Sequence, residues 1–344
     1  MQIRENEPLA GRTTLGVGGA ARWFVEAASE AEVVAAARWA RERGLKLFVL
    51  GGGSNLLVAD EGFDGLVLAV ALQGIAREKD LVRAAAGEEW DHVVSFAVEQ
   101  NLAGLECLAG IPGTAGGTPV QNVGAYGCEA GESIERVHAY DLESGGFVEF
   151  TRAECGFGYR RSRFNAEDRG RYVVTRVDYR LRADGVAELK YADLKTYFAD
   201  RETTPTLVEV AVAVRTIRRR KGMLMVDGDA DCRSAGSFFK NPSVAPEKAA
   251  ELRAWAAGRG LALRTYPAAD GQEKIQAAWL IEQAGFPKGY AMGAAGISSR
   301  HTLALINRGG ARAAEIVALA ERIRAGVAHQ FGIALAMEPV RLGF

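Results

Sequence analysis

The segment from residue 104 to residue 127, GLECLAGIPGTAGGTPVQNVGAYG, constrains this chain more than any other. It holds seven glycines and two prolines, and its apolar residues follow neither a helical nor an alternating period. Glycine permits positive φ and lets a ligand approach main-chain N–H groups, as proteins often do to hold a diphosphate. Loops beyond about 12–15 residues are usually functional or disordered, and the apolar Leu105, Leu108 and Ile111 argue against disorder. We therefore expect a ligand-binding loop, with a plain surface loop as the alternative.

A second glycine cluster lies earlier in the chain. Residues 45–50, LKLFVL, predict a short strand, and GGGSNLL follows from Gly51 to Leu57. N–H groups at the end of a strand can hold an anion. The cluster lacks the Gly-Lys-Ser/Thr ending of a P-loop and is not a GxGxxG fingerprint, so alone it could be a mobile turn. Two glycine loops together favour one phosphate-bearing ligand that spans both.

Length, charge and composition limit which kinds of protein this chain can be. The chain has 344 residues, 48% hydrophobic and 25% charged, with a net charge of −1. This length suits two or three domains, and the near-zero charge gives no overall field for nucleic acid or an anionic membrane. No run reaches the roughly 20 apolar residues of a membrane span, and the first residues are too charged for a signal peptide. We expect a cytoplasmic protein that is a monomer or a weak oligomer.

Cysteine and histidine spacing does not indicate a metal site. The four cysteines form no CxxC pair, and the four histidines are scattered. We expect reduced, small core cysteines and no structural metal.

Helix and strand signals alternate along the chain. Ser29 to Glu32 is a capping box that opens a helix ending at Gly44. Further strands are expected at 81–87 and 171–182, a hairpin at 136–150 with its turn at 144–146, and helices at 90–100 and 206–221. A domain boundary is expected near residue 215. Beyond it we expect helices at about 246–258, 272–285 and 313–332 and a final short apolar strand over 331–342.

Several reactive side chains stand in or beside glycine-rich turns. Arg160 ends FGYR and could bind a carboxylate through two hydrogen bonds, although a surface arginine fits the spacing as well. Ser237, in SAGSFFKNP, could donate a proton from a desolvated turn, yet a turn-forming serine is the simpler interpretation. GxSxG is absent and no histidine is near, which argues against a hydrolytic triad.

A basic cluster closes the helix expected at 206–221. Cations are favoured at a helix C-terminus, so most of the residues Arg215, Arg218, Arg219, Arg220 and Lys221 are expected to be solvated. Lys221, at the helix exit, is the one expected to reach a substrate diphosphate. Glu338, in MEPVR, is a lone carboxylate that could equally be a surface group.

Taken together, these motifs resemble a known family. GGGSN, IPGTAGGTPVQNVGAYG, FGYR, SAGSFFKNP and MEPVR stand in the order and at the spacings of the bacterial UDP-N-acetylenolpyruvoylglucosamine reductases, over nearly the whole chain. The resemblance implies an α+β fold of the vanillyl-alcohol-oxidase (PCMH-like) group, with two subdomains that grip FAD and a C-terminal α+β substrate-binding domain. We assign 1–70 and 71–214 to the FAD subdomains, 215–335 to the substrate domain and 336–344 to a strand returning to the active site.

The resemblance also implies roles for individual residues. Non-covalent FAD would have its pyrophosphate held by Gly51, Gly52, Gly53, Ser54, Asn55 and Leu56. Its ribityl chain and isoalloxazine would be lined by Ile111, Pro112, Gly113, Thr114, Gly116, Gly117, Thr118, Gln121, Asn122, Gly124, Ala125 and Tyr126. The catalytic positions would be Arg160, Ser237 and Glu338. Tyr191, Lys221, Asn241 and Gln283 would contact UDP-N-acetylglucosamine enolpyruvate or, in turn, NADPH.

The implied chemistry is a two-step reduction that supplies UDP-N-acetylmuramate for peptidoglycan. NADPH would reduce FAD and leave, and flavin N5 would then deliver hydride to C3 of the enolpyruvyl ether. Arg160 would stabilise the enolate, with Glu338 positioning the group or assisting proton transfer, and Ser237 would protonate C2.

The chain departs from the family pattern at three places. MEPVR replaces Glu-x-Glu-Val-Arg, which leaves the register of Glu338 open by one residue, and KGMLMVDGDADCR is longer than the usual KLPDP after Lys221. Thr118 stands where a smaller residue is common, although its hydroxyl could donate to a phosphate.

Two alternatives stay open at this point. One is an FAD-dependent oxidase or dehydrogenase of the same fold acting on an alcohol or hydroxy acid. Such enzymes often tether FAD through His or Cys, and Cys107 and Cys128 border the longer loop. The other is a flavin-binding or nucleotide-sensing module without catalysis.

Overall fold

The computed structural model describes residues 1–268 and 271–344 and divides the chain into two compact units. Unit 1 comprises Met1–Pro8, Ala20–Gly53 and Gly62–Arg220. Unit 2 comprises Leu9–Gly19, Ser54–Glu61 and Lys221–Phe344. Two short segments of the first 70 residues thus fold with the C-terminal part of the chain. The further division of unit 1 into two FAD subdomains stays a prediction.

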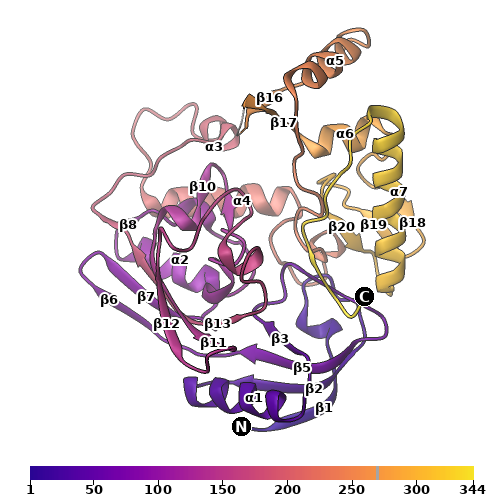
Figure 1. Ribbon diagram of the computed structural model, residues 1–344. Coiled ribbons are helices and arrows are strands. Elements are labelled where there is room, and N and C mark those ends of the chain that lie inside the picture. Colours follow the sequence, from indigo (N-terminus) through magenta and orange to yellow (C-terminus); the bar gives the residue numbers. More distant parts are fainter. Residues whose placement is uncertain (269–270) are drawn as a thin grey trace. The chain divides into compact units, whose positions relative to one another are not determined.

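The first sheet of unit 1 has the strand order β1-β2-β5-β3 (Figure 1). β1 (Ile3–Pro8) pairs antiparallel with β2 (Ala20–Ala27), and β5 (Phe63–Val70) runs parallel to both β2 and β3 (Leu47–Leu50). Helix α1 (Glu30–Glu42) connects β2 to β3. Its expected start is confirmed, because the Ser29 hydroxyl accepts a hydrogen bond from the Glu32 amide at 3.3 Å.

The second sheet of unit 1 is antiparallel throughout, with the order β12-β11-β13-β7-β6. Its strands are β6 (Ile75–Glu78), β7 (Leu81–Ala85), β11 (Ile134–Asp141), β12 (Phe147–Thr151) and β13 (Tyr172–Arg180). The hairpin and both expected strands are therefore confirmed. Apolar residues such as Val137 and Val177 are fully buried on one face of this sheet, in the core of unit 1.

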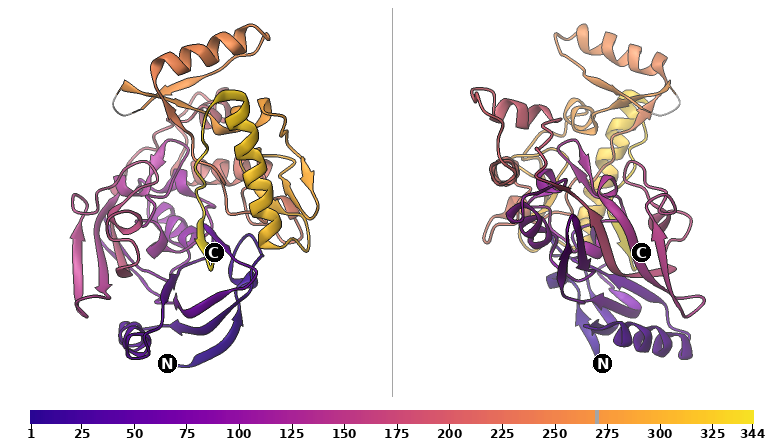
Figure 2. Two further views of the ribbon diagram at one scale, coloured as in Figure 1. Left: turned by 45° about the vertical axis from the view of Figure 1, so that its right-hand side comes forward. Right: turned by 90° about the vertical axis from the view of Figure 1, so that its left-hand side faces the viewer.

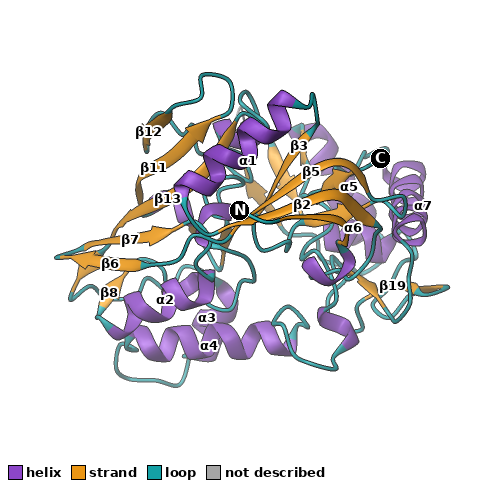
Figure 3. Ribbon diagram, turned by 90° about the horizontal axis from the view of Figure 1, so that it is seen from below, coloured by secondary structure: helices purple, strands orange, loops and turns teal. Residues whose placement is uncertain are grey.

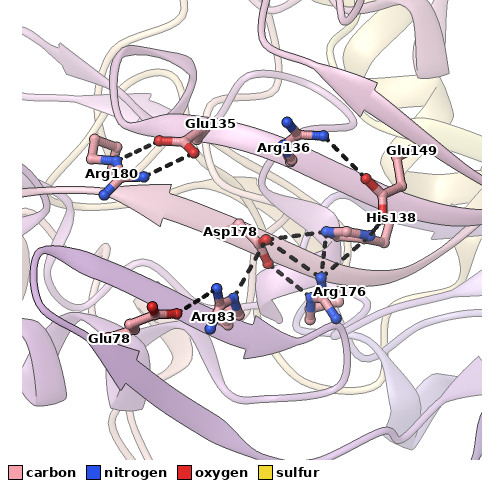
Figure 4. A network of polar contacts seen from close by, with 9 residues as sticks. All are labelled: Glu78, Arg83, Glu135, Arg136, His138, Glu149, Arg176, Asp178 and Arg180. Carbon is pink, nitrogen blue, oxygen red and sulfur yellow. Dashed lines mark hydrogen bonds and ion pairs between the residues drawn. The ribbon is translucent and has the colours of Figure 1, made fainter.

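A network of charged residues crosses the neighbouring strands of this sheet (Figure 4). At its centre the buried Asp178 lies 3.1 Å from Nε2 of His138 and accepts a hydrogen bond from Nε of Arg176 at 2.8 Å. Burial tends to raise the pKa of Asp178, but these two hydrogen bonds outweigh it and the pKa is lowered. Cross-strand pairs of opposite charge stabilise a sheet.

The helices α2 (Trp90–Glu99) and α4 (Leu207–Arg220) contact each other and lie side by side (Figure 3). Both confirm expected helices. The remaining elements of unit 1 are short: β8 (Leu102–Ala103) pairs with β14 (Arg182–Ala183), β9 (Gly124–Ala125) pairs with β10 (Cys128–Glu129), and α3 spans Ala192–Tyr197. Single 3-10 turns lie at Glu106–Leu108 (η2), Ala115–Gly117 (η3), Ala130–Glu132 (η4) and Arg163–Asn165 (η5).

Unit 2 is built around the long helix α7 (Ala313–Phe331), drawn in yellow in Figure 2. Its other elements are η1 (Ala10–Arg12), β4 (Leu56–Val58), η6 (Ala230–Cys232), β15 (Ser243–Val244), α5 (Pro246–Ala257), β16 (Thr265–Pro267), β17 (Glu273–Ile275), α6 (Ala277–Gln283), β18 (Ala291–Met292), β19 (Ala295–Ile297), β20 (Leu305–Asn307) and β21 (Val340–Leu342). Buried residues of α7, including Ile316, Leu319 and Ile323, join Phe238 and Phe239 in one core.

Two expectations for unit 2 were wrong in extent. The helix expected over 272–285 begins only at Ala277, because Glu273–Ile275 pairs with strands on both sides, β15 and β16. The final strand expected over 331–342 is limited to Val340–Leu342, which pairs parallel with β4. Ile333 and Leu335 alternate with exposed residues, as a strand would. Within the described residues, however, they do not pair with another strand, and their side chains are buried in the core that includes α7. None of the described helices combines the length and the apolar character that a membrane span needs.

Candidate functional site

The two glycine loops predicted from the sequence touch each other in unit 1. A Cβ added to Gly52 would lie 2.5 Å from the Cα of Gly113, and one added to Gly51 would lie 3.0 Å from Oγ1 of Thr114. Real Cβ atoms do not approach backbone that closely, so glycine is required at Gly52. Gly53 and Gly113 also have φ values of +63° and +131°, which favour glycine. The glycines thus let two main chains meet.

Charged side chains hold the start of the longer loop. The amide of Gly110 donates to Asp91 at 2.6 Å, and its carbonyl accepts from Nε of Arg218 at 2.9 Å. Arg215 makes a bidentate pair with the same Asp91, at 2.8 and 3.0 Å. The amide of Gly104 donates to the buried Glu106 at 2.7 Å. This part of the loop is therefore rigidly anchored.

The expectation that most of the basic cluster is solvated was wrong for two of its members. Arg218 is 7% exposed, and burial lowers its pKa. A signal was present in the sequence: Ala211, Val214 and Arg218 follow helical spacing, so Arg218 shares the apolar face of α4. Arg215 is half-buried against α2 in its pair with Asp91, whereas Arg219 and Arg220 are exposed as expected.

Polar groups at the contact of the two loops fit a phosphate-bearing ligand. The Thr114 hydroxyl oxygen is buried and has no hydrogen-bond partner among the described residues. Within the same part of the chain, the amides of Gly51, Gly52 and Thr114 donate no main-chain hydrogen bond. An orphaned hydroxyl beside glycine amides is the donor set that an anion needs. The residues present therefore fit the diphosphate of FAD.

Farther along the loop, two predicted cofactor residues direct their side chains into the protein. The Thr118 hydroxyl donates to the carbonyl of Ala115 at 2.7 Å and lies 2.8 Å from the hydroxyl of Tyr179. The suggestion that it donates to a phosphate is therefore wrong, because the proton is already used. The side-chain amide of Asn122 donates to Glu129 at 2.6 Å and to the carbonyl of Gly158 at 3.0 Å, and its main chain has φ +46°.

The end of the loop makes two contacts with predicted site residues outside it. Arg160 donates from Nη2 to the carbonyl of Gly124 at 2.8 Å, and it occupies the left-handed region at φ +53°. Tyr126 packs edge-to-face against Tyr191, with ring centroids 5.5 Å apart. Burial raises the pKa of Tyr126 to about 12, so its hydroxyl stays protonated at neutral pH. A fixed cation thus lies beside the predicted isoalloxazine loop.

In unit 2, Ser237 and Glu338 stand on neighbouring segments. The amide of Glu338 donates to the carbonyl of Phe238 at 2.9 Å, and the main-chain amide of Lys240 donates to the carbonyl of Ala336 at 2.9 Å. This pairing sets Glu338 beside the residue that follows Ser237, and Ser237 itself is half-buried. Asn55 joins them, because its side-chain amide lies 3.4 Å from the carbonyl oxygen of Glu338.

The remaining predicted residues are placed as follows. Asn241 accepts a hydrogen bond from the amide of Ala277 at 2.9 Å, so it caps the start of α6, and Gln283 ends the same helix. Lys221 directly follows α4. Unit 1 contains Gly51, Gly52, Gly53, Ile111, Pro112, Gly116, Gly117, Gln121 and Ala125, whereas unit 2 contains Ser54 and Leu56.

Known proteins match this chain over its whole length. Residues 21–151 match the family described as FAD binding domain, and residues 228–342 match the C-terminal domain of UDP-N-acetylenolpyruvoylglucosamine reductase. A reductase of that name from Streptomyces coelicolor is 46% identical, covering 100% of this chain and 91% of its own. The chain belongs to the UDP-N-acetylenolpyruvoylglucosamine reductase family. It is an FAD-dependent oxidoreductase.

Two further comparisons agree with this family. The reductase from Thermobifida fusca is 46% identical, covering 98% of this chain and 97% of its own. The crystal structure of the reductase from Thermus caldophilus superposes with a TM-score of 0.69 at 27% identity, covering 99% and 100% of the two chains. The resemblance and the α+β FAD-binding fold expected from the sequence are confirmed. Because the family consists of reductases, the alternative that this protein is a flavin-binding or nucleotide-sensing module without catalysis is disfavoured.

Proposed function

We propose that this protein reduces UDP-N-acetylglucosamine enolpyruvate to UDP-N-acetylmuramate, with NADPH as the electron donor, in peptidoglycan synthesis. The observation that carries the proposal is the full-length relation to reductases of this name, at 46% identity. The same relation favours this activity over the oxidation of an alcohol or hydroxy acid.

The paired glycine loops are proposed to hold non-covalent FAD. Gly51 to Asn55 would bind its pyrophosphate through main-chain amides, and Thr114 would give its unpaired hydroxyl to the same group. Residues from Ile111 to Tyr126 would line the ribityl chain and the ring. When bound, the flavin supplies hydride to the substrate after it has been reduced by NADPH.

Arg160 is proposed to stabilise the negative charge that develops at C2 and the carboxylate of the substrate. Its guanidinium is a permanent cation with a planar set of donors, which suits a carboxylate or an enolate. The hydrogen bond to the Gly124 carbonyl supports this role, because a donor fixed in advance costs little reorganisation during the reaction.

Ser237 is proposed to donate the proton to C2. Phe238 and Phe239 follow it and are 0% and 1% exposed, so the serine stands next to a buried apolar segment. A hydroxyl is a weak acid in water and needs such a site together with a polar neighbour. Glu338, on the adjacent segment, is proposed to position the substrate or to assist this transfer.

The substrate and the nicotinamide nucleotide are proposed to share a second set of contacts. Tyr191 is 43% exposed above Tyr126 and could cover a bound sugar nucleotide. Lys221 would bind the diphosphate as a point charge. Asn241 and Gln283 stand at opposite ends of α6, so they would reach different parts of the ligand.

Separate half-reactions test this function. Ser237→Ala should leave bleaching of the bound flavin by NADPH intact, whereas reoxidation of the reduced enzyme by the enolpyruvyl substrate should slow at least about a hundredfold. Ser243→Ala, an exposed serine in the same unit, is the matched control and should retain both steps. Equal loss in both half-reactions would refute the proton-donor role. Purified protein that is colourless and takes up no added FAD would refute the function itself.

A further inference from the structure

The hydroxyl of Thr14 lies between two main-chain segments that the proposed function uses. It donates a hydrogen bond to the carbonyl of Ser234 at 2.6 Å, and the carbonyl oxygen of Ser54 lies 3.4 Å from the same hydroxyl oxygen. Ser54 belongs to the shorter glycine loop, and Ser234 begins the turn that leads to Ser237. All four residues belong to unit 2, although 220 positions separate Thr14 from Ser234.

Thr14 is itself held by the residues that follow it. Leu15 is 0% exposed and shares a core with Phe238. The carbonyl of Gly16 accepts a hydrogen bond from Nδ2 of Asn307 at 3.0 Å. Because the chain is fixed directly after Thr14, its hydroxyl has a defined position.

The turn from Ser234 to Ser237 is short and is held at both ends. The Ser234 hydroxyl accepts a hydrogen bond from the amide of Gly236 at 3.3 Å, and Gly236 has φ +72°, which favours glycine. Directly after Ser237, the amide of Phe238 donates to the carbonyl of Leu303 at 2.8 Å. Ser237 therefore lies between two bonded points, the carbonyl of Ser234 and the amide of Phe238.

We propose that Thr14 is a positioning residue for Ser237, because its hydroxyl fixes the start of the turn that carries the serine. This role rests on the proposed function, since it concerns the proton that Ser237 gives to C2. A threonine hydroxyl has one proton to donate. The bond to Ser234 has the usual length for a hydroxyl donor, whereas the contact with Ser54 is longer and weaker.

A small shift of this turn should be enough to impair proton transfer. The donor oxygen must come within about 2.6–3.2 Å of the atom that it protonates. Without the Thr14 hydroxyl, the carbonyl of Ser234, a residue 6% exposed, loses this donor, and the turn can move. The isolated bridge between Ser234 and Ile306 does not involve the Thr14 side chain. The shift should therefore stay local, and the protein should still fold and bind flavin.

The test compares side chains with and without a hydroxyl at position 14 in the flavin-loaded protein. In Thr14→Val and Thr14→Ala, reduction of the flavin by NADPH should be unchanged. Reoxidation by the enolpyruvyl substrate should slow by about 10–100-fold, as expected for a proton donor that is slightly misplaced. Thr14→Ser keeps the donor and should restore most of the rate.

The dependence on substrate concentration separates positioning from substrate binding. In stopped-flow experiments with Thr14→Val, the limiting rate constant of reoxidation should fall. The substrate concentration that gives half of this rate should stay constant, because the lost interaction acts in the transition state.

Thr13→Val is the matched control for the loss of a hydroxyl. The Thr13 hydroxyl donates to the carbonyl of Ala10 at 3.2 Å and accepts from the amide of Gly16 at 3.1 Å, within its own turn. Both half-reactions should be retained in this variant.

A double variant tests whether Thr14 acts through the serine. Adding Thr14→Val to Ser237→Ala should slow reoxidation no further, because the effects of two residues that act as a unit do not add.

Each result decides the proposal. Normal reoxidation in both Thr14→Val and Thr14→Ala would overturn it, and so would equal slowing of both half-reactions or loss of folding or flavin binding in both variants. Failure of Thr14→Ser to recover the rate, or full additional slowing in the double variant, would also overturn it. If the reduced wild-type enzyme is not reoxidised by the substrate, the proposed function fails, and the role of Thr14 fails with it.

Discussion

Gly52 and Gly113, from two separate loops, touch main chain to main chain. A methyl group on Gly52 would lie 2.5 Å from the Cα of Gly113 and 3.2 Å from the amide nitrogen of Thr114. The close approach gathers main-chain donors from both loops around the buried Thr114 hydroxyl.

Gly52→Ala should therefore disrupt the flavin site. The added Cβ would overlap with backbone atoms, so the two loops must separate. Their amides would then no longer point toward one anion. We expect the Kd for FAD, measured by flavin titration, to rise at least about tenfold, which is about 1.4 kcal/mol. Gly146→Ala, whose Cβ would meet its nearest atom at 3.8 Å, is the control and should bind normally. An unchanged Kd in Gly52→Ala would show that the contact is not needed.

Thr114→Val should weaken FAD binding without lowering stability, whereas Thr118→Val should lower stability. Thr114 carries a buried hydroxyl without a partner, so its removal should leave the free energy of unfolding of the flavin-free protein unchanged or higher, while the Kd for FAD rises. Thr118 uses its hydroxyl within the protein, so its removal should cost about 1–3 kcal/mol of stability. Urea unfolding and flavin titration of both variants measure this, and equal behaviour would contradict the assignment.

Arg218→Gln should destabilise unit 1, whereas Arg220→Gln should not. Arg218 is buried and supports the carbonyl of Gly110, which then lacks its donor. We expect a loss of about 1–3 kcal/mol in the free energy of unfolding for Arg218→Gln and a change within about 0.5 kcal/mol for the exposed Arg220. Similar values for the two variants in urea titrations would argue against the support of Gly110 by Arg218.

Arg160→Gly should separate stability from catalysis. Glycine adopts φ +53° without strain, which offsets the loss of the hydrogen bond to Gly124, so we expect the melting temperature to change little. Without the guanidinium, reoxidation of the reduced enzyme by substrate should slow by about 10²–10³, while reduction by NADPH continues. Stopped-flow absorbance follows both steps. Normal reoxidation would remove Arg160 from the mechanism.

Asp178→Asn should reduce the loss of unfolding free energy that occurs as the pH falls into the acid range. The folded-state pKa of Asp178 is lowered, so its contribution is present above the unfolded pKa of about 3.9 and is lost as the pH falls through the folded value. The variant should therefore be less stable at pH 7 and differ less from wild type at pH 3. Urea titrations at both values test the sign. A difference that grows toward low pH would contradict it.

Local sequence signals predicted many elements because they depend on neighbouring residues. The Ser29 capping box, the turn at 144–146 and the alternation at 171–182 each gave a confirmed helix, hairpin or strand. The helix predicted over 272–285 begins too early, because Glu273–Ile275 forms a strand that pairs with β15 and β16, which lie elsewhere in the chain. Helical spacing could have shown that Arg218 is buried, but charge alone suggested solvent.

The sequence by itself determined the family, the FAD-binding fold and the two glycine loops, because glycine patterns and motif order are properties of the linear chain. Only the tertiary structure decided that Gly52 meets Gly113, and that Thr118 uses its hydroxyl within the protein whereas the Thr114 hydroxyl has no partner among the described residues. The physical reason is that a hydrogen bond or a steric contact depends on which distant segments share a space, and spacing along the chain does not encode that directly.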